Sequence, residues 1–148
     1  MLNPGEKAPD FILQDQHRNP VNLYSILQSK KAVVYFYPKD ETPGCTAEAC
    51  SFRDNYEDFK VLGAEVIGIS RDSGKAHNSF ASNHQLPFTL LSDPGGKAAK
   101  SFKVPKTLGI IPGRVTYVID QNHTILSSFN SQFNALLHIQ EALKALKA

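Results

Sequence analysis

Two cysteines lie five residues apart in this chain, and they are its only cysteines. They fall in the segment YPKDETPGCTAEAC, residues 37–50, which follows an apolar run and opens a stretch with helical periodicity. Cys45 therefore lies in or just before the first turn of a helix. Unpaired backbone N–H groups and the helix dipole favour a thiolate there. The segment thus predicts a nucleophilic sulfur at Cys45.

Ionisation alone gives such a sulfur little advantage. Lowering a thiol pKa from ~8.5 to ~6 raises the thiolate fraction at neutral pH only about thirtyfold. A larger rate enhancement requires hydrogen-bond donors directed at the charge that develops in the transition state. The Thr42 hydroxyl and a guanidinium from elsewhere in the chain are the candidates.

The role of Cys50 is open from spacing alone. If both cysteines are helical, their Cα atoms lie ~8.6 Å apart, beyond the ~7 Å that a disulfide tolerates. Either the two sulfurs never bond, or the helix start unwinds, which Pro43 and Gly44 favour as poor helix residues. A free cysteine is also a common small core residue.

The elements around this segment alternate between strand and helix patterns. Strands are predicted at residues 11–13, 32–37, 65–70, 115–120 and 124–129, the last two joined by a turn. Helices are predicted at residues 22–29 with Asn22 as cap, 46–62 with Gly63 at C′, 73–84, 93–102, and after Asn134. The last helix has an apolar stripe of Leu136, Ile139, Leu143 and Leu146.

This order predicts one α/β domain over residues 1–148, with a central mixed sheet flanked by helices on both faces. It fits a thioredoxin-like fold. A flavodoxin-like sheet is the rival, but its parallel pattern does not predict the closing hairpin. Ligand sites of open α/β sheets lie beyond the carboxyl ends of the strands, where residues 37–50 are expected.

Composition excludes several classes of function. The net charge is +2 and the basic residues are scattered, which argues against a nucleic-acid or anionic-membrane partner. No apolar stretch reaches the ~20 residues of a membrane span, and residues 1–10 lack the features of a secretory signal. Few cysteines without an export signal indicate a reducing compartment, which we expect to be the cytoplasm, or an organelle if a transit peptide has been removed.

Several motifs in one order resemble a known family. Residues 38–45, PKDETPGC, match the PxxxTxxC signature of peroxiredoxins. A second cysteine five residues later, here Cys50, resembles the pattern of the Q subgroup, also called bacterioferritin comigratory proteins. The similarity extends over nearly the whole chain. The further matching segments are residues 5–11 (GEKAPDF), 52–54 (FRD), 86–93 (LPFTLLSD) and 112–120 (PGRVTYVID). Residues 103–113 match less tightly, and access to the pocket could be set there.

The resemblance implies a role for each matching residue. Cys45 would be the peroxidatic nucleophile, leaving a sulfenic acid, and Cys50 would resolve it as a Cys45–Cys50 disulfide. Thr42 would hydrogen-bond the thiolate and the peroxide. Arg114 would lower the thiol pKa and stabilise the transition state.

Two supporting residues complete this set. Pro38 would shield the pocket from water, and Glu48, on the helix face of Cys45, would hold Arg114 in place. The resemblance also implies a monomer that is recycled by thioredoxin or a similar dithiol protein and needs no metal, haem or flavin.

Two other interpretations use the same site. A redox-sensing module would oxidise stoichiometrically and act through a partner, and a structural thioredoxin-like domain would carry inert cysteines. The five histidines have no metal-binding spacing, and neither a phosphate-binding GxxxxGK loop nor a GxSxG elbow occurs.

Overall fold

The structure is a computed structural model that describes residues 1–107 and 111–148. Seven strands form one mixed sheet in the order β2-β1-β5-β4-β3-β8-β9. They are β1 (Ile12–Asp15), β2 (Pro20–Asn22), β3 (Lys31–Phe36), β4 (Ala64–Ser70), β5 (Thr89–Ser92), β8 (Val115–Ile119) and β9 (Ile125–Asn130). The central strands β3, β4 and β5 are parallel, whereas β8 runs antiparallel to β3 and β9 antiparallel to β8.

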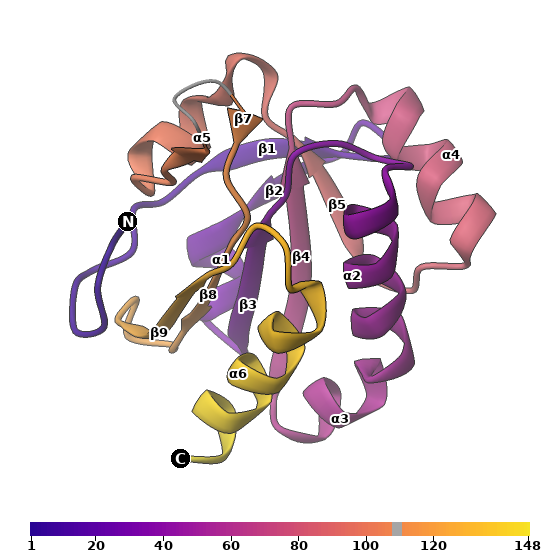
Figure 1. Cartoon of the computed structure of the whole chain (residues 1–148). Helices are drawn as coiled ribbons and strands as arrows, with labels where there is room; N and C mark the ends of the chain where they lie inside the picture. The colour runs from indigo at the N-terminus through magenta and orange to yellow at the C-terminus, as the bar shows by residue number, and fades with distance from the viewer. Residues whose placement is uncertain (108–110) are drawn as a thin grey trace.

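Helices cover both faces of this sheet, as the sequence predicted (Figure 1). They are α1 (Leu23–Leu27), α2 (Pro43–Asp54), α3 (Tyr56–Val61), α4 (Gly74–His84), the 3-10 turn η1 (Pro94–Gly96), α5 (Lys97–Ser101) and α6 (Ala135–Lys147). The helices α2, α3, α4 and α6 contribute to one apolar cluster, and α1 and α5 to the other. A small hairpin of β6 (Lys106–Thr107) and β7 (Ile111–Pro112) stands apart from the main sheet.

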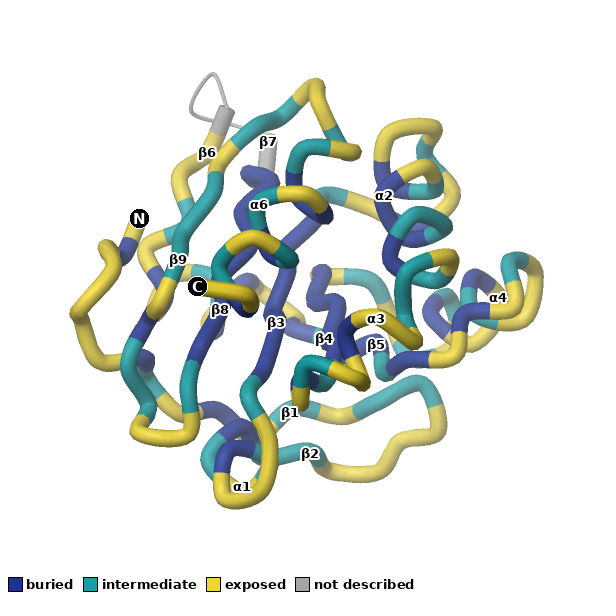
Figure 2. The backbone as a smooth tube through the Cα atoms, turned by 90° about the horizontal axis from the view of Figure 1, so that it is seen from below, coloured by how far each residue is buried: buried dark blue, intermediate teal, exposed yellow. Residues whose placement is uncertain are grey.

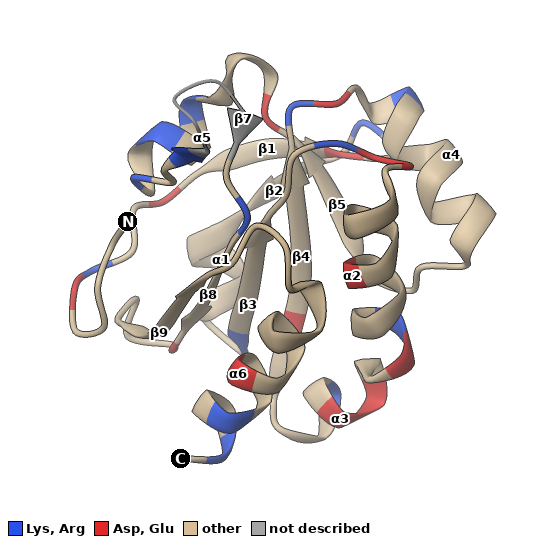
Figure 3. Ribbon diagram, viewed as in Figure 1, with Lys and Arg blue, Asp and Glu red and all other residues tan. Residues whose placement is uncertain are grey.

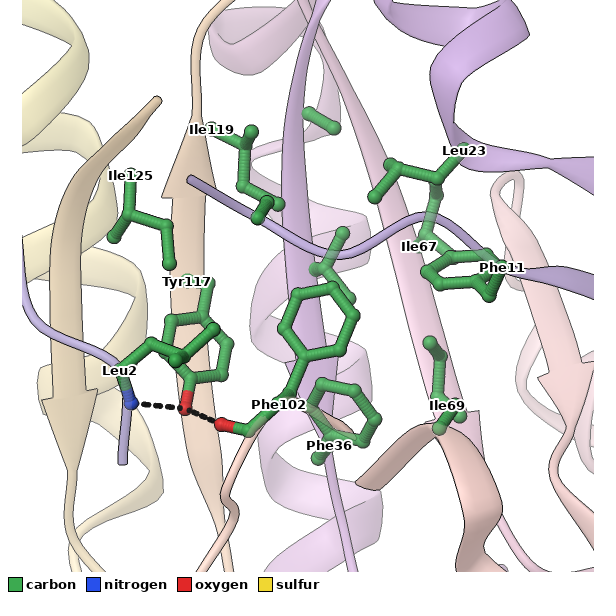
Figure 4. Packing of buried hydrophobic residues seen from close by; sticks show 14 of the residues in the cluster. Leu2, Phe11, Leu23, Phe36, Ile67, Ile69, Phe102, Tyr117, Ile119 and Ile125 are labelled. Atoms are coloured by element: carbon green, nitrogen blue, oxygen red, sulfur yellow. Dashed lines mark hydrogen bonds between the residues drawn. The ribbon is translucent and has the colours of Figure 1, made fainter. Parts of the chain in front are cut away.

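The sheet separates two apolar cores, because successive residues of a strand point to opposite faces. In β3, Val33 and Tyr35 join the cluster under α2, and Val34 and Phe36 join the other. The tube in Figure 2 is accordingly buried along β3, β4 and β8. Figure 4 shows the second cluster, where the Tyr117 hydroxyl donates to the Phe102 carbonyl at 2.6 Å.

One predicted helix is two helices. The stretch predicted as a helix over residues 46–62 breaks at Asn55, which has φ −108° and ψ 10°. The Asn55 side chain donates to the Ser51 carbonyl at 2.8 Å, a local bond that competes with continued helix. The helix also begins earlier, at Pro43, because proline fits the first helical position, where no N–H is required. Gly63 has φ +77°, as predicted for a C′ residue.

The other differences have similarly local causes. The helix predicted over residues 93–102 is divided because Gly95 and Gly96 have φ of 76° and 73°. The short strands β2 and β5 were not predicted, since three and four residues give too little periodicity. In the predicted apolar stripe of α6, Ile139 and Leu146 are buried, but Leu136 is 57% exposed, because the buried face also includes His138 and Ala142.

The remaining boundaries agree with the predictions to within about three residues, and the Asn22 side chain caps α1 by accepting from Ser25 N–H at 3.0 Å. Figure 3 shows Lys and Arg distributed over several elements, as the scattered charge indicated. Within residues 1–107 and 111–148, no helix is both long enough and apolar enough to cross a bilayer.

Candidate active site

Cys45 lies where the sequence placed it, at the start of the helix that follows the central strand. Residues 37–42 lead from β3 into α2, and Thr42 is the extended N-cap residue, with φ −87° and ψ 150°. The Thr46 N–H donates to the Thr42 carbonyl at 2.8 Å and closes the first turn around Cys45. Cys45 itself is only 1% exposed, so its sulfur is almost completely shielded from solvent.

Arg114 reaches this sulfur from far along the chain. Val115 pairs with Phe36 at the carboxyl end of β3, and the preceding residue therefore lies beside the start of α2. Its Nη2 donates to Cys45 Sγ at 3.3 Å, a contact that stabilises an ionised sulfur. A Cβ on Gly44 would lie 3.0 Å from that Nη2, so the absence of a side chain there lets the guanidinium approach.

Two further acceptors orient the guanidinium. Arg114 Nη1 donates to Glu48 Oε1 at 2.7 Å, and Nε donates to the Gln132 carbonyl at 3.2 Å. Glu48 lies three residues after Cys45 on the same helix face and is fully buried. The structure thus brings the predicted Cys45, Arg114 and Glu48 into one hydrogen-bonded group.

Burial controls the charge of this group. Desolvation raises the pKa of Glu48 to about 7, although Arg114 pulls it down. Burial alone would lower the pKa of Arg114, but Glu48 and Cys45 outweigh it and the net direction is upward. Among the described residues, Glu48 Oε2 has no hydrogen-bond partner, and it lies 3.4 Å from His138 Nδ1. The carboxyl therefore changes charge close to neutral pH.

Thr42 and Pro38 border the site. The Thr42 hydroxyl donates to the Lys39 carbonyl at 2.8 Å and not to the sulfur, which leaves its lone pairs to accept a hydrogen bond. Pro38 is partly buried. Their predicted roles toward a peroxide stay predictions.

Cys50 is a free, partly buried thiol in the same helix as Cys45. Both cysteines are helical, so the Cα separation of ~8.6 Å expected from helix geometry applies. A Cys45–Cys50 disulfide thus requires part of α2 to unwind, and the bond stays a prediction.

Sequence reasoning missed the residue that anchors the loop before Cys45. Asp40 is 7% exposed, and its carboxylate accepts from the Tyr37 hydroxyl at 2.5 Å and lies 2.6 Å from His77 Nδ1. Its backbone N–H donates to the Asp72 carboxylate at 2.7 Å. These partners lie up to 37 residues away, and no spacing in the sequence signals them.

The side chains of Asp40, Asp72 and His77 place potential metal ligands within 4.8 Å of one another. His77 is occupied on both ring nitrogens, since Nε2 also donates to the Leu91 carbonyl at 2.9 Å. Because these groups already satisfy one another, we assign the cluster to anchoring the loop.

A cavity of about 420 Å³ lies beside the site at the carboxyl ends of the strands. Its described lining includes Tyr37, Arg71, Val104, Lys106 and Gly113, and does not include Cys45. Part of the segment predicted to control access therefore borders this cavity, and residues 108–110 of that segment lie outside the described residues.

Comparisons with known proteins agree with this geometry. The AhpC/TSA family matches residues 4–128. Peroxiredoxin Q, chloroplastic, of Arabidopsis thaliana is 54% identical over 148 residues, which span 99% of this chain and 68% of the relative. The chain belongs to the AhpC/TSA family, as a peroxiredoxin of the Q type.

Solved structures support the same assignment for this peroxiredoxin. Peroxidoxin BcpB of Mycobacterium tuberculosis superposes with a TM-score of 0.92 at 36% identity, covering 99% of this chain and 97% of that chain. The bacterioferritin comigratory protein of Xanthomonas campestris gives 0.84 at 29% identity, with 93% and 90% covered. The thioredoxin-like fold is confirmed, and membership of the family makes this chain a thiol-dependent peroxidase.

Proposed function

We propose that this peroxiredoxin reduces hydrogen peroxide and organic hydroperoxides at Cys45. The contact of Arg114 Nη2 with the buried Cys45 Sγ is the observation that carries this proposal. The X. campestris relative is a protein with alkyl peroxide reduction activity, which supports the inclusion of organic hydroperoxides.

The first step is a displacement at oxygen. The Cys45 thiolate attacks the terminal peroxide oxygen, the S–O bond forms as the O–O bond breaks, and the leaving oxygen takes up one proton as water or alcohol. Sulfur is oxidised to a sulfenic acid and the peroxide is reduced. Arg114 offers a fixed cation to the developing charge, Thr42 accepts the peroxide O–H, and Pro38 keeps water from the sulfur.

The second step forms the disulfide. The Cys50 thiolate attacks the sulfenic sulfur, the Cys45–Cys50 bond forms, and water leaves with the sulfenic oxygen. Two features of α2 support the local unwinding that this step needs. Its second residue is Gly44, a poor helix former, and its N-cap Thr42 makes no side-chain capping bond.

An external dithiol completes the cycle by thiol–disulfide exchange, and we propose thioredoxin or a similar protein. Resolution within one chain is consistent with a monomer. Such a reductant operates in a thiol-reducing compartment, either the cytoplasm or an organelle stroma. The A. thaliana relative is chloroplastic by name.

The cysteine variants test this cycle in an assay that couples NADPH oxidation to thioredoxin reductase, thioredoxin and hydrogen peroxide. We expect Cys45→Ser to abolish peroxide consumption. Cys50→Ser should retain the first turnover, stop cycling and expose Cys45 to overoxidation, which mass spectrometry detects.

Ser51→Ala, one residue further along α2, is the matched control and should cycle like the wild type. Sustained cycling by Cys50→Ser would contradict the resolving role. Oxidation that stops after one equivalent in the wild type, with thioredoxin active, would instead favour a redox-sensing module.

A further inference from the structure

His138 is a fully buried histidine of α6 that the peroxidase cycle described above does not use. Its Nε2 lies 2.9 Å from the Ser131 carbonyl, and its Nδ1 lies 2.7 Å from Thr116 Oγ1 and 3.4 Å from Glu48 Oε2. The Phe129 ring packs against the imidazole edge to face at 4.9 Å. The ring is therefore held by polar contacts from α2, β8 and the segment before α6.

Two of these contacts lead to the groups that orient Arg114. The Gln132 carbonyl accepts from Arg114 Nε, and the neighbouring Ser131 N–H donates to the Arg114 carbonyl at 3.3 Å. Glu48 accepts from Arg114 Nη1 through Oε1, while its other oxygen faces the imidazole. His138 thus lies beside Glu48, one support of the guanidinium, and contacts Ser131, the residue next to Gln132, which is the other support. The third nitrogen of that guanidinium donates to Cys45.

The partners of His138 determine its tautomer. A carbonyl only accepts, so Nε2 carries the proton toward Ser131 and the neutral ring presents a lone pair at Nδ1. The Thr116 hydroxyl donates to that lone pair. Glu48 Oε2 also faces the Nδ1 lone pair, but it can donate a hydrogen bond to it only when the carboxyl is protonated, because a carboxylate has no proton to donate. The neutral imidazole consequently favours the neutral carboxyl over the anion.

We propose that His138 is a positioning residue for the peroxide reaction, holding the Glu48 carboxyl and residues 131–132 against Arg114 so that the guanidinium stays directed at Cys45 Sγ. The role rests on the proposed peroxidase cycle. Within the described residues, the titratable groups that face Glu48 are His138 of α6, Arg114 before β8 and Tyr35 of β3, and Arg114 in turn contacts Cys45 of α2.

The charge states agree with this arrangement. Burial lowers the pKa of His138 to about 4, and the Arg114 cation acts in the same direction. The imidazole is therefore neutral at physiological pH, and the proton that titrates near pH 7 belongs to Glu48. Desolvation is the main cause of the raised pKa of Tyr35, which keeps that hydroxyl neutral.

The first test measures the second-order rate constant for oxidation of Cys45 by hydrogen peroxide at pH 7, with thiol loss followed by rapid quench. We expect His138→Leu to lower it about 10- to 100-fold, because a misdirected donor forfeits transition-state stabilisation. His123→Gln is the control. That ring stacks on Tyr24 at 3.7 Å, away from the site, and the variant should react like the wild type.

The second test follows the protonation of Glu48 by the infrared band of its neutral carboxyl, assigned with Glu48→Gln. His138→Leu removes the Nδ1 acceptor, so the midpoint of the Glu48 titration should fall below the wild-type value of about 7. Lost packing that lets water reach Glu48 would also lower the midpoint, because desolvation is the main cause of the raised pKa. His138→Asn separates the two causes: it also leaves space, but its amide oxygen can accept near the position of Nδ1, so it should retain the wild-type midpoint. An unchanged rate constant, or a lower rate with an unchanged midpoint, would overturn the proposal.

Two conservative variants keep the question answerable if His138→Leu does not fold. His138→Gln places an amide near the position of Nε2, which contacts Ser131, and His138→Asn places one near the position of Nδ1, which faces Thr116 and Glu48. Each variant therefore retains one of the two sets of polar contacts. We expect both variants to oxidise Cys45 at rates between those of the wild type and of His138→Leu. Wild-type rates in both would refute the role. Failure of the wild type itself to react with peroxide would instead contradict the proposed function.

Discussion

Arg114 directs its three guanidinium nitrogens at three different acceptors, namely the Cys45 sulfur, the Glu48 carboxyl and the Gln132 carbonyl. Only a planar fork satisfies three directions at once, whereas a lysine ammonium supplies charge from a flexible stem. At the scale of single residues, the site therefore depends on geometry as well as on charge.

Arg114→Lys separates these two contributions. It retains the cation but loses the fork, so we expect oxidation of Cys45 by hydrogen peroxide to slow about 100-fold. Rapid-quench measurements of peroxide consumption by the reduced protein give the rate of this oxidation. Arg53 lies in α2, the helix of Cys45, and its guanidinium donates to the His84 carbonyl at 2.8 Å. Arg53→Lys is the control and should slow the reaction little. A wild-type rate for Arg114→Lys would show that charge alone suffices.

Glu48 gives the protein a predictable pH dependence. Its pKa is raised in the folded state from 4.5 to about 7, so its favourable contribution is present below pH 4.5 and is lost as the pH rises through about 7. Glu48→Gln removes this titration. Between pH 4.5 and 8, the unfolding free energy of the variant should gain about 3 kcal/mol relative to the wild type.

Urea unfolding of both proteins at several pH values measures that difference. Both retain His138 and every other titrating group, so those contributions cancel in the comparison. A difference that stays constant with pH would mean that Glu48 is ionised throughout this range.

At the same scale, residue types alone predicted Cys45 and left Cys50 open. Family resemblance supplied Arg114 and Glu48, and the structure places Arg114 against the sulfur and Glu48 against Arg114. Asp40 and His138 were missed because their partners come from other elements, and only tertiary structure joins a strand end to a distant helix.

At the scale of elements, α2 is stable along most of its length and weak at its start. Phe52 is fully buried near its end, whereas its second residue is Gly44 and its N-cap hydroxyl bonds elsewhere. We therefore expect any unwinding of α2 to begin at its N-terminal end, on the side of Cys45.

Ala47→Gly tests whether unwinding limits disulfide formation. Ala47 is exposed between the two cysteines, and glycine there weakens the helix by about 1 kcal/mol, which is about fivefold in an opening equilibrium. We expect the Cys45–Cys50 bond to form about five times faster after the first oxidation, with that first step unchanged. Lys144→Gly, an exposed substitution in α6, should leave both steps unchanged.

Periodicity predicted the long helices and the buried central strands of this fold. It did not predict the break at Asn55, because a single side-chain bond to Ser51 decides it. Nor did it predict the edge strand β2, which begins at a proline and has three residues. Short or locally interrupted elements depend on contacts that periodicity does not contain.

At the scale of the whole molecule, one backbone contact connects the segment before Arg114 to the chain after α5. A Cβ on Gly113 would lie 2.0 Å from the Pro105 carbonyl oxygen, so the backbone would have to move. We expect Gly113→Ala to destabilise the protein by about 1–3 kcal/mol and to slow peroxide reduction by displacing Arg114.

Thermal unfolding together with the peroxide assay measures both effects. Gly74→Ala is the matched control, because its Cβ would meet only the Asp15 carbonyl oxygen at an ordinary 3.5 Å. A Gly113→Ala protein with normal stability and rate would show that residues 104–105 yield readily.

The two apolar clusters on opposite faces of the sheet differ in their relation to the reactive helix. Cys45, Ala49 and Phe52 belong to one cluster, and no residue of α2 belongs to the other, which is built on Phe36, Tyr117 and their neighbours. Unwinding of α2 would therefore disturb the cluster that contains Cys45 and not the cluster on the other face. Amide protons behind the sheet should therefore exchange at equal rates in the dithiol and disulfide proteins, because opening of the reactive helix would leave that half of the molecule folded.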